Sequence, residues 1–317
     1  MTASEPRLRF GVHSGQQYES YGEIRELWQR AEELGYDWCS VFDHLRPPMG
    51  GPAGPCFEGT TLLSALAAST SRVRCALMVA PVAWRHPAVL AALAATIDHV
   101  SDGRVELGIG VGGADLAHGQ YGLPQPPRAD RLGMLEETAE VLRGLWSGEP
   151  VTFVGKHFRL TEAHLRPVPV QPRLPLVVGG VSEPVLRTVA RHGDVWNSLL
   201  ADPAEYRERS ARLDRRCEEA GRDPASVRRS MTFRALLVED PADLPGELER
   251  LRRRYPPDSP VWPEYLVFGT PEQCAEALRP YVGLGVTDFV LGVRPPVDWR
   301  CVTLFADQVV PQLRASR

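Results

Sequence analysis

The stretch YGEIRELWQRAEELGYDWCSVFDH, residues 21–44, decides the fold. Apolar side chains such as Ile24 and Leu27 recur there at the spacing of a helix, and Gly35 is a natural place for that helix to stop. A short apolar run over residues 36–42 follows at once and is typical of a buried strand. A helix joined to a strand by so short a loop is the repeating unit of parallel β/α folds.

The same unit returns in ARHGDVWNSL, residues 190–199, and in YVGLGVTDFVLGV, residues 281–293. Five more runs read as strands: Leu8–Val12, Val73–Ala80, Val105–Ile109, Leu174–Val178 and Met231–Val238. Further helices are predicted near residues 60–69, 87–100, 131–147, 184–192, 203–220, 242–254, 271–283 and 302–313. Eight such alternations favour a closed (β/α)8 TIM barrel over an open doubly wound sheet.

Two features interrupt this alternation. Residues 112–130 are rich in Gly and Pro, and residues 150–172 look like an irregular excursion before the fifth strand. No low-complexity linker separates one part of the chain from another. We therefore expect one domain over residues 1–317, an α/β barrel with insertions after strands 4 and 7.

Composition excludes several classes of function. The net charge of −4 gives no reason to expect nucleic acid or a membrane surface as partner. The N-terminal residues lack an apolar signal region, and no run approaches the ~18 apolar residues of a membrane span. The six cysteines are scattered, without a C-x-x-C pair, so we expect free thiols, no metal site and a cytoplasmic protein.

Chemistry in such a barrel belongs at the carboxyl ends of its strands, and Asp43-His44 ends the second one. The pair could equally cap a turn, since Asp and His often do. Gly179-Gly180 ends the fifth strand, and Ser182 can cap the helix that follows. Glycine backbone and a helix N-terminus together make a natural phosphate site, although an ordinary loop has the same pattern.

The segment GIGVGG, residues 108–113, resembles a dinucleotide fingerprint only superficially, because it leads into the Gly/Pro-rich stretch instead of a helix. A loop that grips a flat cofactor is the better functional interpretation, and simple turn chemistry is the alternative. Arg85 and His86, before Pro87, are interpreted as residues that structure a turn.

Taken together, the chain resembles the luciferase-like monooxygenase superfamily, and especially its deazaflavin-dependent oxidoreductases that use coenzyme F420. Five stretches, which follow one another in the family's order, carry the match: SVFDHLRPP (40–48), MVAPVAWRHPAV (78–89), DGRVELGIGVG (102–112), RLGMLEETAEVLRGLWSGEPVTFVGKHF (131–158) and PLVVGGVSEPVLRTVARHGDVWN (175–197). A sixth segment near the C-terminus, YVGLGVTDFVL, adds to them. The resemblance implies a (β/α)8 barrel, a small-molecule substrate and a homodimer.

Carried over position by position, the resemblance assigns a cofactor site. Asp43 and His44 match the family's acid–histidine pair that faces the deazaflavin ring. The Met78–Val79 bond matches the place where the family often has a non-prolyl cis peptide behind that ring. The remaining matches are to backbone: Gly179, Gly180 and Val181 to the phosphate-binding segment, and Gly110 and Gly112 to the loop beside the cofactor.

The sequence also departs from the sugar-phosphate dehydrogenases of this branch. Gly113 stands where they carry a glutamate, and Pro48 where they carry a tryptophan. We therefore expect a substrate other than glucose-6-phosphate. Its pocket would be formed by residues 45–57, 112–130 and 239–265, whose composition encodes no readable specificity.

The expected reaction is hydride transfer between F420 and a small organic substrate with a C=C, C=N or alcohol/carbonyl group. His44 would move a proton or only hydrogen-bond the ring, and Asp43 would orient His44 or bind the cofactor. His13, Glu58 and His118 are candidates for the substrate side. The alternatives are a monooxygenase that uses reduced FMN and a flavin-binding barrel without catalysis.

Overall fold

Eight parallel strands close into a barrel in the computed structural model, which describes residues 7–48, 53–113, 117–254 and 266–316. Their order is β1-β2-β3-β4-β7-β8-β9-β11, and β11 pairs with β1 to close the circle. Their bounds are β1 Arg9–His13, β2 Trp38–Val41, β3 Arg74–Pro81, β4 Val105–Gly110, β7 Leu176–Gly179, β8 Val195–Leu199, β9 Arg228–Leu237 and β11 Val286–Gly292. The predicted (β/α)8 barrel is confirmed.

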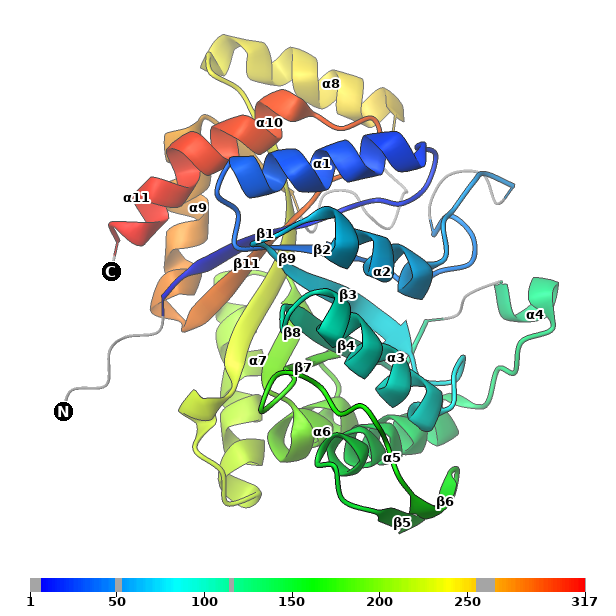
Figure 1. The fold of residues 1–317 in the computed structure, drawn as a ribbon. Helices are drawn as coiled ribbons and strands as arrows, with labels where there is room; N and C mark the ends of the chain where they lie inside the picture. The colour runs from blue at the N-terminus through cyan, green and yellow to red at the C-terminus, as the bar shows by residue number, and fades with distance from the viewer. Residues whose placement is uncertain (1–6, 49–52, 114–116, 255–265, 317) are drawn as a thin grey trace.

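Helices surround this barrel and alternate with its strands (Figure 1). Their bounds are α1 Tyr21–Glu33, α2 Gly59–Ser69, α3 Pro87–Val100, α5 Arg128–Trp146, α6 Glu183–His192, α7 Pro203–Glu219, α8 Leu244–Arg254, α9 Pro271–Gly283, α10 Trp299–Leu304 and α11 Val310–Arg314. Local sequence sets several ends: Ser20 with Glu23, and Thr270 with Gln273, form capping boxes at the starts of α1 and α9. In the part of the chain that is described, no helix is both long and apolar enough to cross a bilayer.

The barrel interior is filled by side chains rather than left open. Trp38, Ala76 and Val290 form a buried cluster, and Met78 packs against it. A Cβ at Gly11 would lie 2.3 Å from the Trp38 indole, so β1 needs glycine at this point. The strands thus enclose a packed core at this level of the barrel.

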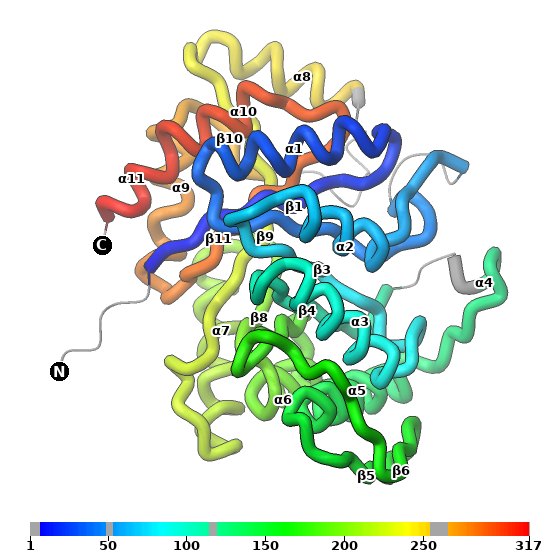
Figure 2. Tube along the Cα trace, viewed as in Figure 1, coloured from blue at the N-terminus to red at the C-terminus, as the bar shows by residue number. Residues whose placement is uncertain are grey.

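The structure adds elements that the sequence did not predict. Residues 150–172 contain an antiparallel hairpin, β5 Val151–Val154 and β6 Arg159–Ala163, where an irregular excursion was expected. A ninth strand, β10 Leu266–Gly269, pairs with the far half of β9, on the side where α8, α9 and α10 gather (Figure 2). The short helix α4, Ala117–Tyr121, stands out from the barrel within the insertion after β4 (Figure 1).

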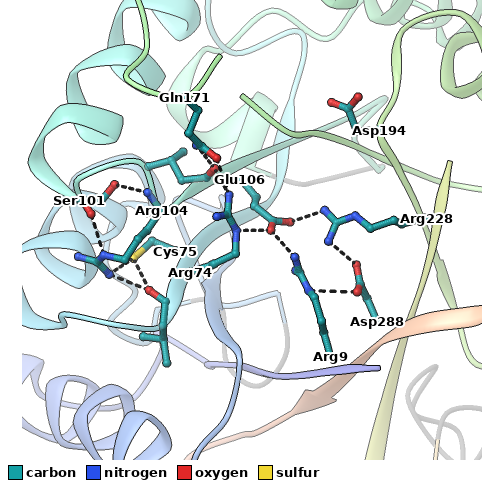
Figure 3. Close-up of polar contacts among 12 residues, drawn as sticks. Arg9, Arg74, Cys75, Ser101, Arg104, Glu106, Gln171, Asp194, Arg228 and Asp288 are labelled. Carbon is teal, nitrogen blue, oxygen red and sulfur yellow. Dashed lines mark hydrogen bonds and ion pairs between the residues drawn. The ribbon is translucent and has the colours of Figure 1, made fainter. Parts of the chain in front are cut away.

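A buried network of charges closes the amino-terminal end of the barrel. Figure 3 shows Glu106 of β4 surrounded by the guanidinium groups of Arg9, Arg74 and Arg228. Asp288 lies 3.1 Å from Arg9 and 3.2 Å from Arg228. Burial by itself would raise the pKa of Glu106, but the charges of Arg9, Arg228 and Arg74 outweigh it and hold that pKa well below its usual range. This end of the barrel is therefore a structural plug.

Candidate active site

Three adjoining pockets, of about 400, 250 and 440 Å³, occupy the carboxyl end of the barrel strands. We call them the middle, inner and cradle pockets, in that order. Met78 lines all three. His13 lines the middle and inner pockets, His44 the inner and cradle pockets, and Gly179 the cradle and middle pockets. Residues from β1, β2, β3 and β7 thus meet around one continuous space, as predicted from their positions at strand ends.

The floor of this space is the end of β3. The Met78–Val79 peptide bond is cis, where the resemblance led us to expect it. The Val79 side chain lies against glycines of the neighbouring strands: a Cβ at Gly110 would be 2.6 Å from it, and one at Gly179 3.3 Å. Glycine in β4 and β7 therefore leaves room for Val79.

Asp43 faces away from the pockets and into an ion-pair cluster. Its side chain is fully buried and pairs with both terminal nitrogens of Arg85, which also bonds Glu58. A Cβ at Gly59 would lie 2.9 Å from the Asp43 Cα, so the start of α2 approaches this cluster closely. Arg85, interpreted from sequence as part of a turn, is the residue that sequence reasoning missed here.

The two carboxylates of this cluster titrate differently. Burial raises the pKa of Asp43, and Arg85 only partly offsets that effect. Burial also opposes ionisation of Glu58, but hydrogen bonds from Thr61 and Thr60 outweigh it and lower the pKa of Glu58 to about 2. Glu58 thus serves as the N-cap of α2 and as a partner of Arg85, and it is absent from the described lining of the three pockets.

His44 points into the pockets, unlike its neighbour Asp43. Its ring meets Phe42 at a centroid distance of 5.4 Å and Trp84 at 6.2 Å, edge to face in both cases. Two aromatic side chains therefore orient the imidazole, and Trp84 itself lines the cradle pocket. This places an imidazole ring beside the space that Met78 and Val79 border.

His13 is the second imidazole of the site. Its Nδ1 lies 2.8 Å from the Ser40 hydroxyl, which fixes the ring across β1 and β2. Burial, helped by the nearby charges of Arg294 and His44, lowers the pKa of His13 to about 4. His13 is consequently neutral at physiological pH, and one ring nitrogen can donate or accept a hydrogen bond within the pocket.

The cradle pocket has the features of an anion site. Gly180 has φ of +126°, which few other residues adopt, and its carbonyl accepts a hydrogen bond of 2.8 Å from the Trp196 indole. Val181 and Ser182 lead into α6, and the buried Ser182 Oγ has no hydrogen-bond partner among the described residues. Arg128 lines the same pocket. A helix N-terminus, a free hydroxyl and an arginine together fit a phosphate group.

The loop after β4 is held from α5. Arg131 is buried and donates hydrogen bonds to the carbonyl groups of Val111, Gly112 and Gly113. Gly112 has φ of +75° and lines the cradle pocket. The predicted glycine loop is thus bound to α5 at the edge of the pocket, and the arginine that binds it was not recognised from sequence.

Two further predictions concern His118 as a substrate-side residue and the expected absence of a metal site. His118 lies in α4, but its side chain is outside the described part of the structure. Among the residues described, no group of three or more His, Cys, Asp or Glu is arranged to hold a metal ion.

Curated relatives cover nearly the whole chain. An F420-dependent glucose-6-phosphate dehydrogenase of Intrasporangium calvum is 32% identical, with 93% of this chain and 96% of the relative covered. The protein of the same name from Nakamurella multipartita is 28% identical, with 98% of each chain covered.

Solved structures share the fold. An F420-dependent secondary alcohol dehydrogenase in complex with an F420–acetone adduct superimposes with a TM-score of 0.83 at 22% identity, covering 97% of this chain and 99% of that one. A coenzyme F420-dependent tetrahydromethanopterin reductase from Methanopyrus kandleri gives 0.80 at 18% identity, with the same shares covered. The family model described as luciferase-like monooxygenase matches residues 6–265. The chain belongs to the luciferase-like monooxygenase family.

Proposed function

We propose that the protein is an F420-dependent oxidoreductase that transfers a hydride between the deazaflavin and a small organic substrate. The observation that carries the proposal is that His44 and the segment Gly179–Ser182 line one pocket, so that an imidazole and a phosphate cradle are held in one space. Relatives of near full length that are named F420-dependent support this choice of cofactor.

The residues present fit such a cofactor. Gly179, Gly180, Val181 and Ser182 would hold its phosphate, and Met78 and Val79 would lie behind its ring. Bound there, a deazaflavin supplies a carbon centre that gives or takes a hydride. The glycine loop held by Arg131 would border the ring on its β4 side.

His44 would hold or move the proton that accompanies hydride transfer, through an imidazole nitrogen that faces the pocket. Asp43 would act through position, because its carboxylate is bound to Arg85 and is fully buried. Phe42 and Trp84 keep the His44 ring in place. The neutral His13 would contact the substrate side, since it lines the inner pocket.

We infer a substrate other than glucose-6-phosphate, although the curated relatives are named for it. The reason is that the two departures from the sugar-phosphate branch fall at the pockets: Pro48 lines the inner pocket and Gly113 the cradle pocket. Absence of turnover with glucose-6-phosphate, in protein that binds F420, is the expected result.

The test is anaerobic titration of the protein with F420 and with FMN. F420 should bind in the micromolar range or tighter, and FMN at least tenfold more weakly. Reduced F420 should then reduce some members of a panel of C=C, C=N and carbonyl compounds. Tighter binding of FMN with oxygen consumption would replace the proposal with a monooxygenase, and binding without any turnover would leave a non-catalytic barrel.

A further inference from the structure

Asn197, the only asparagine of the chain, presents an unused acceptor to the middle pocket. It lies in β8, is 9% exposed, and its Nδ2 donates to the Ser230 hydroxyl at 3.0 Å and to the Thr232 hydroxyl at 3.1 Å. Both hydrogens of the amide nitrogen are thus used inside the barrel. The Oδ1 atom accepts no hydrogen bond from the described residues, so it is left for a ligand in the pocket.

The same two hydrogen bonds orient the hydroxyl groups of Ser230 and Thr232. Because each hydroxyl oxygen accepts from Asn197, its own proton is available for donation, and neither donates to another described residue. Ser230 is 2% exposed, whereas Thr232 lines both the middle and the inner pocket. The Thr232 hydroxyl is therefore a donor that lies beside the Asn197 acceptor and faces the same space.

Little net charge surrounds this donor and acceptor. Among the described residues that line the middle pocket, Arg209 alone has a charged side chain at neutral pH, and it pairs with Glu205 of α7. His13, which lines the pocket too, is neutral because its pKa is lowered to about 4. Ser198, another lining residue, is 3% exposed, and its Oγ has no hydrogen-bond partner among the described residues. The pocket therefore suits an uncharged polar group that brings its own donors and acceptors.

The middle pocket is continuous with the phosphate cradle. Residues 179–181 line both pockets, and so do Met78 and Val79. Glycine at positions 179 and 180 leaves only backbone on that part of the wall. A molecule whose phosphate lies at Ser182 can therefore extend a ring into the middle pocket, which has a volume of about 400 Å³.

We propose that Asn197 and Thr232 bind the pyrimidinedione edge of the deazaflavin ring. Along that edge a carbonyl, an N–H and a second carbonyl follow one another. The N3–H group donates to Asn197 Oδ1, and the Thr232 hydroxyl donates to a flanking carbonyl oxygen. The phenolic edge of the ring has no such alternation of acceptor and donor. The inference rests on the proposed function, because it takes the ring to be held beside the cradle, and it makes Asn197 and Thr232 the residues that fix the orientation of the ring.

The experiment compares two probes, the 5′-phosphate of 5-deazariboflavin and its N3-methyl derivative, which lacks the N3–H group, by calorimetry with the whole protein. Wild type should bind the methyl derivative at least about tenfold more weakly, because Asn197 Oδ1 is then left without a donor. Asn197→Ala should weaken binding of F420 and of the unmethylated probe by about tenfold and reduce the difference between the probes to less than about threefold. Thr232→Val should weaken both probes alike, by about three- to tenfold, since both keep their carbonyl groups.

Thr287→Val is the matched control. Thr287 lies in β11 at the amino end of the barrel and its hydroxyl donates to the Arg229 carbonyl at 3.3 Å, so both affinities should change by less than about twofold. Equal binding of the two probes to wild type, or an unchanged preference in folded Asn197→Ala, overturns the inference, while F420 binding leaves the proposed function standing. If Asn197→Ala does not fold, the wild-type preference together with weaker binding in Thr232→Val supports the inference, and the absence of either overturns it. If F420 does not bind to wild type, the proposed function fails and this inference fails with it.

Discussion

Arg85 binds both carboxylate oxygens of the buried Asp43, with the Nη2–Oδ1 contact at 3.2 Å. This pair connects the segment that follows β2, in which His44 is the next residue, to the turn that starts α3. The acid of the acid–histidine pair is thus matched with a cation, and only the histidine faces the pockets. The pairing makes the ionisation of Asp43 depend on Arg85, which lies in the turn after the neighbouring strand β3.

Arg85→Gln should leave the Asp43 carboxylate buried without a counter-ion and beside Glu58, so the already raised pKa of Asp43 should rise further. We expect the acid limb of the pH profile of kcat/KM to move up by about one pH unit or more. Arg85→Lys should restore part of the shift. Arg191→Gln, which breaks an exposed pair with Glu136, is the control. An identical pH profile in Arg85→Gln would show that Asp43 has no part in turnover.

His44→Ala should lower kcat by about 100-fold or more if the imidazole moves a proton, since that is the usual size of such a contribution. The Kd for F420 should stay within a few-fold of wild type. His44→Gln separates the two possible roles, because an amide can hydrogen-bond the ring but cannot exchange a proton near neutral pH. Full activity in His44→Gln would reduce the role of His44 to hydrogen bonding. His99→Ala, at an exposed position in α3, is the control for loss of an imidazole.

Ser182→Asp should place a negative charge at the cradle without harming α6, because aspartate is as good an N-cap as serine. We expect the Kd for F420 to rise by at least about tenfold through repulsion of the phosphate. Thermal stability should be unchanged or slightly higher. Ser182→Ala removes only the hydroxyl and should have a smaller effect. Equal F420 affinity in Ser182→Asp and wild type would place the phosphate elsewhere.

His13 should make stability depend on pH. Its pKa is about 4 in the folded protein against 6.5 in the unfolded chain, so the unfolded chain takes up the proton first as pH falls. This contribution to stability is complete above pH 6.5 and is lost between 6.5 and 4. His13→Asn, which keeps a polar group near Ser40, should remove on the order of 3 kcal/mol of the pH dependence over that window. Urea unfolding of both proteins at several pH values measures it, and parallel curves would contradict the expectation.

Glu106→Gln should destabilise the fold by about 3 kcal/mol or more, since it leaves Arg9, Arg74 and Arg228 with too little negative charge in a buried site. The folded fraction should bind F420 as wild type does, because the plug lies at the opposite end of the barrel. Glu249→Gln, in an exposed pair with Arg253 within α8, should cost less than about 0.5 kcal/mol. Urea unfolding with F420 titration tests both statements.

Local patterns were sufficient to predict the barrel, because each strand and helix carries its own periodicity and end signals. The eight barrel strands lie within a few residues of their predicted places. The elements that were not predicted depend on partners distant in sequence. An example is β10, which is four residues long and pairs with the second half of β9. The predicted helix over residues 302–313 is instead α10, a π-helical turn over Phe305–Val309, and α11, beginning where Asp298 caps it.

The site was predictable only in part. Asp43, His44 and the glycines follow strands, so their meeting at one rim follows from the fold. Arg85 could not be assigned, because its partners lie 27 and 42 positions earlier and nothing in RHP distinguishes an ion pair from a turn. Arg131 was likewise hidden, since a helix residue that binds three loop carbonyls has no sequence pattern.

The contact of Val79 with Gly110 and Gly179 has a consequence for redesign of this floor. A Cβ at Gly110 would lie 2.6 Å from the Val79 side chain and cannot be accommodated while valine is present. A smaller residue in place of Val79 would open a void in the floor of the pockets. Libraries that randomise one of these positions at a time should yield almost no active clones. To reshape the floor for a different tricyclic ring, Val79, Gly110 and Gly179 should be varied together, so that a larger side chain on one strand is matched by a smaller one on its neighbour.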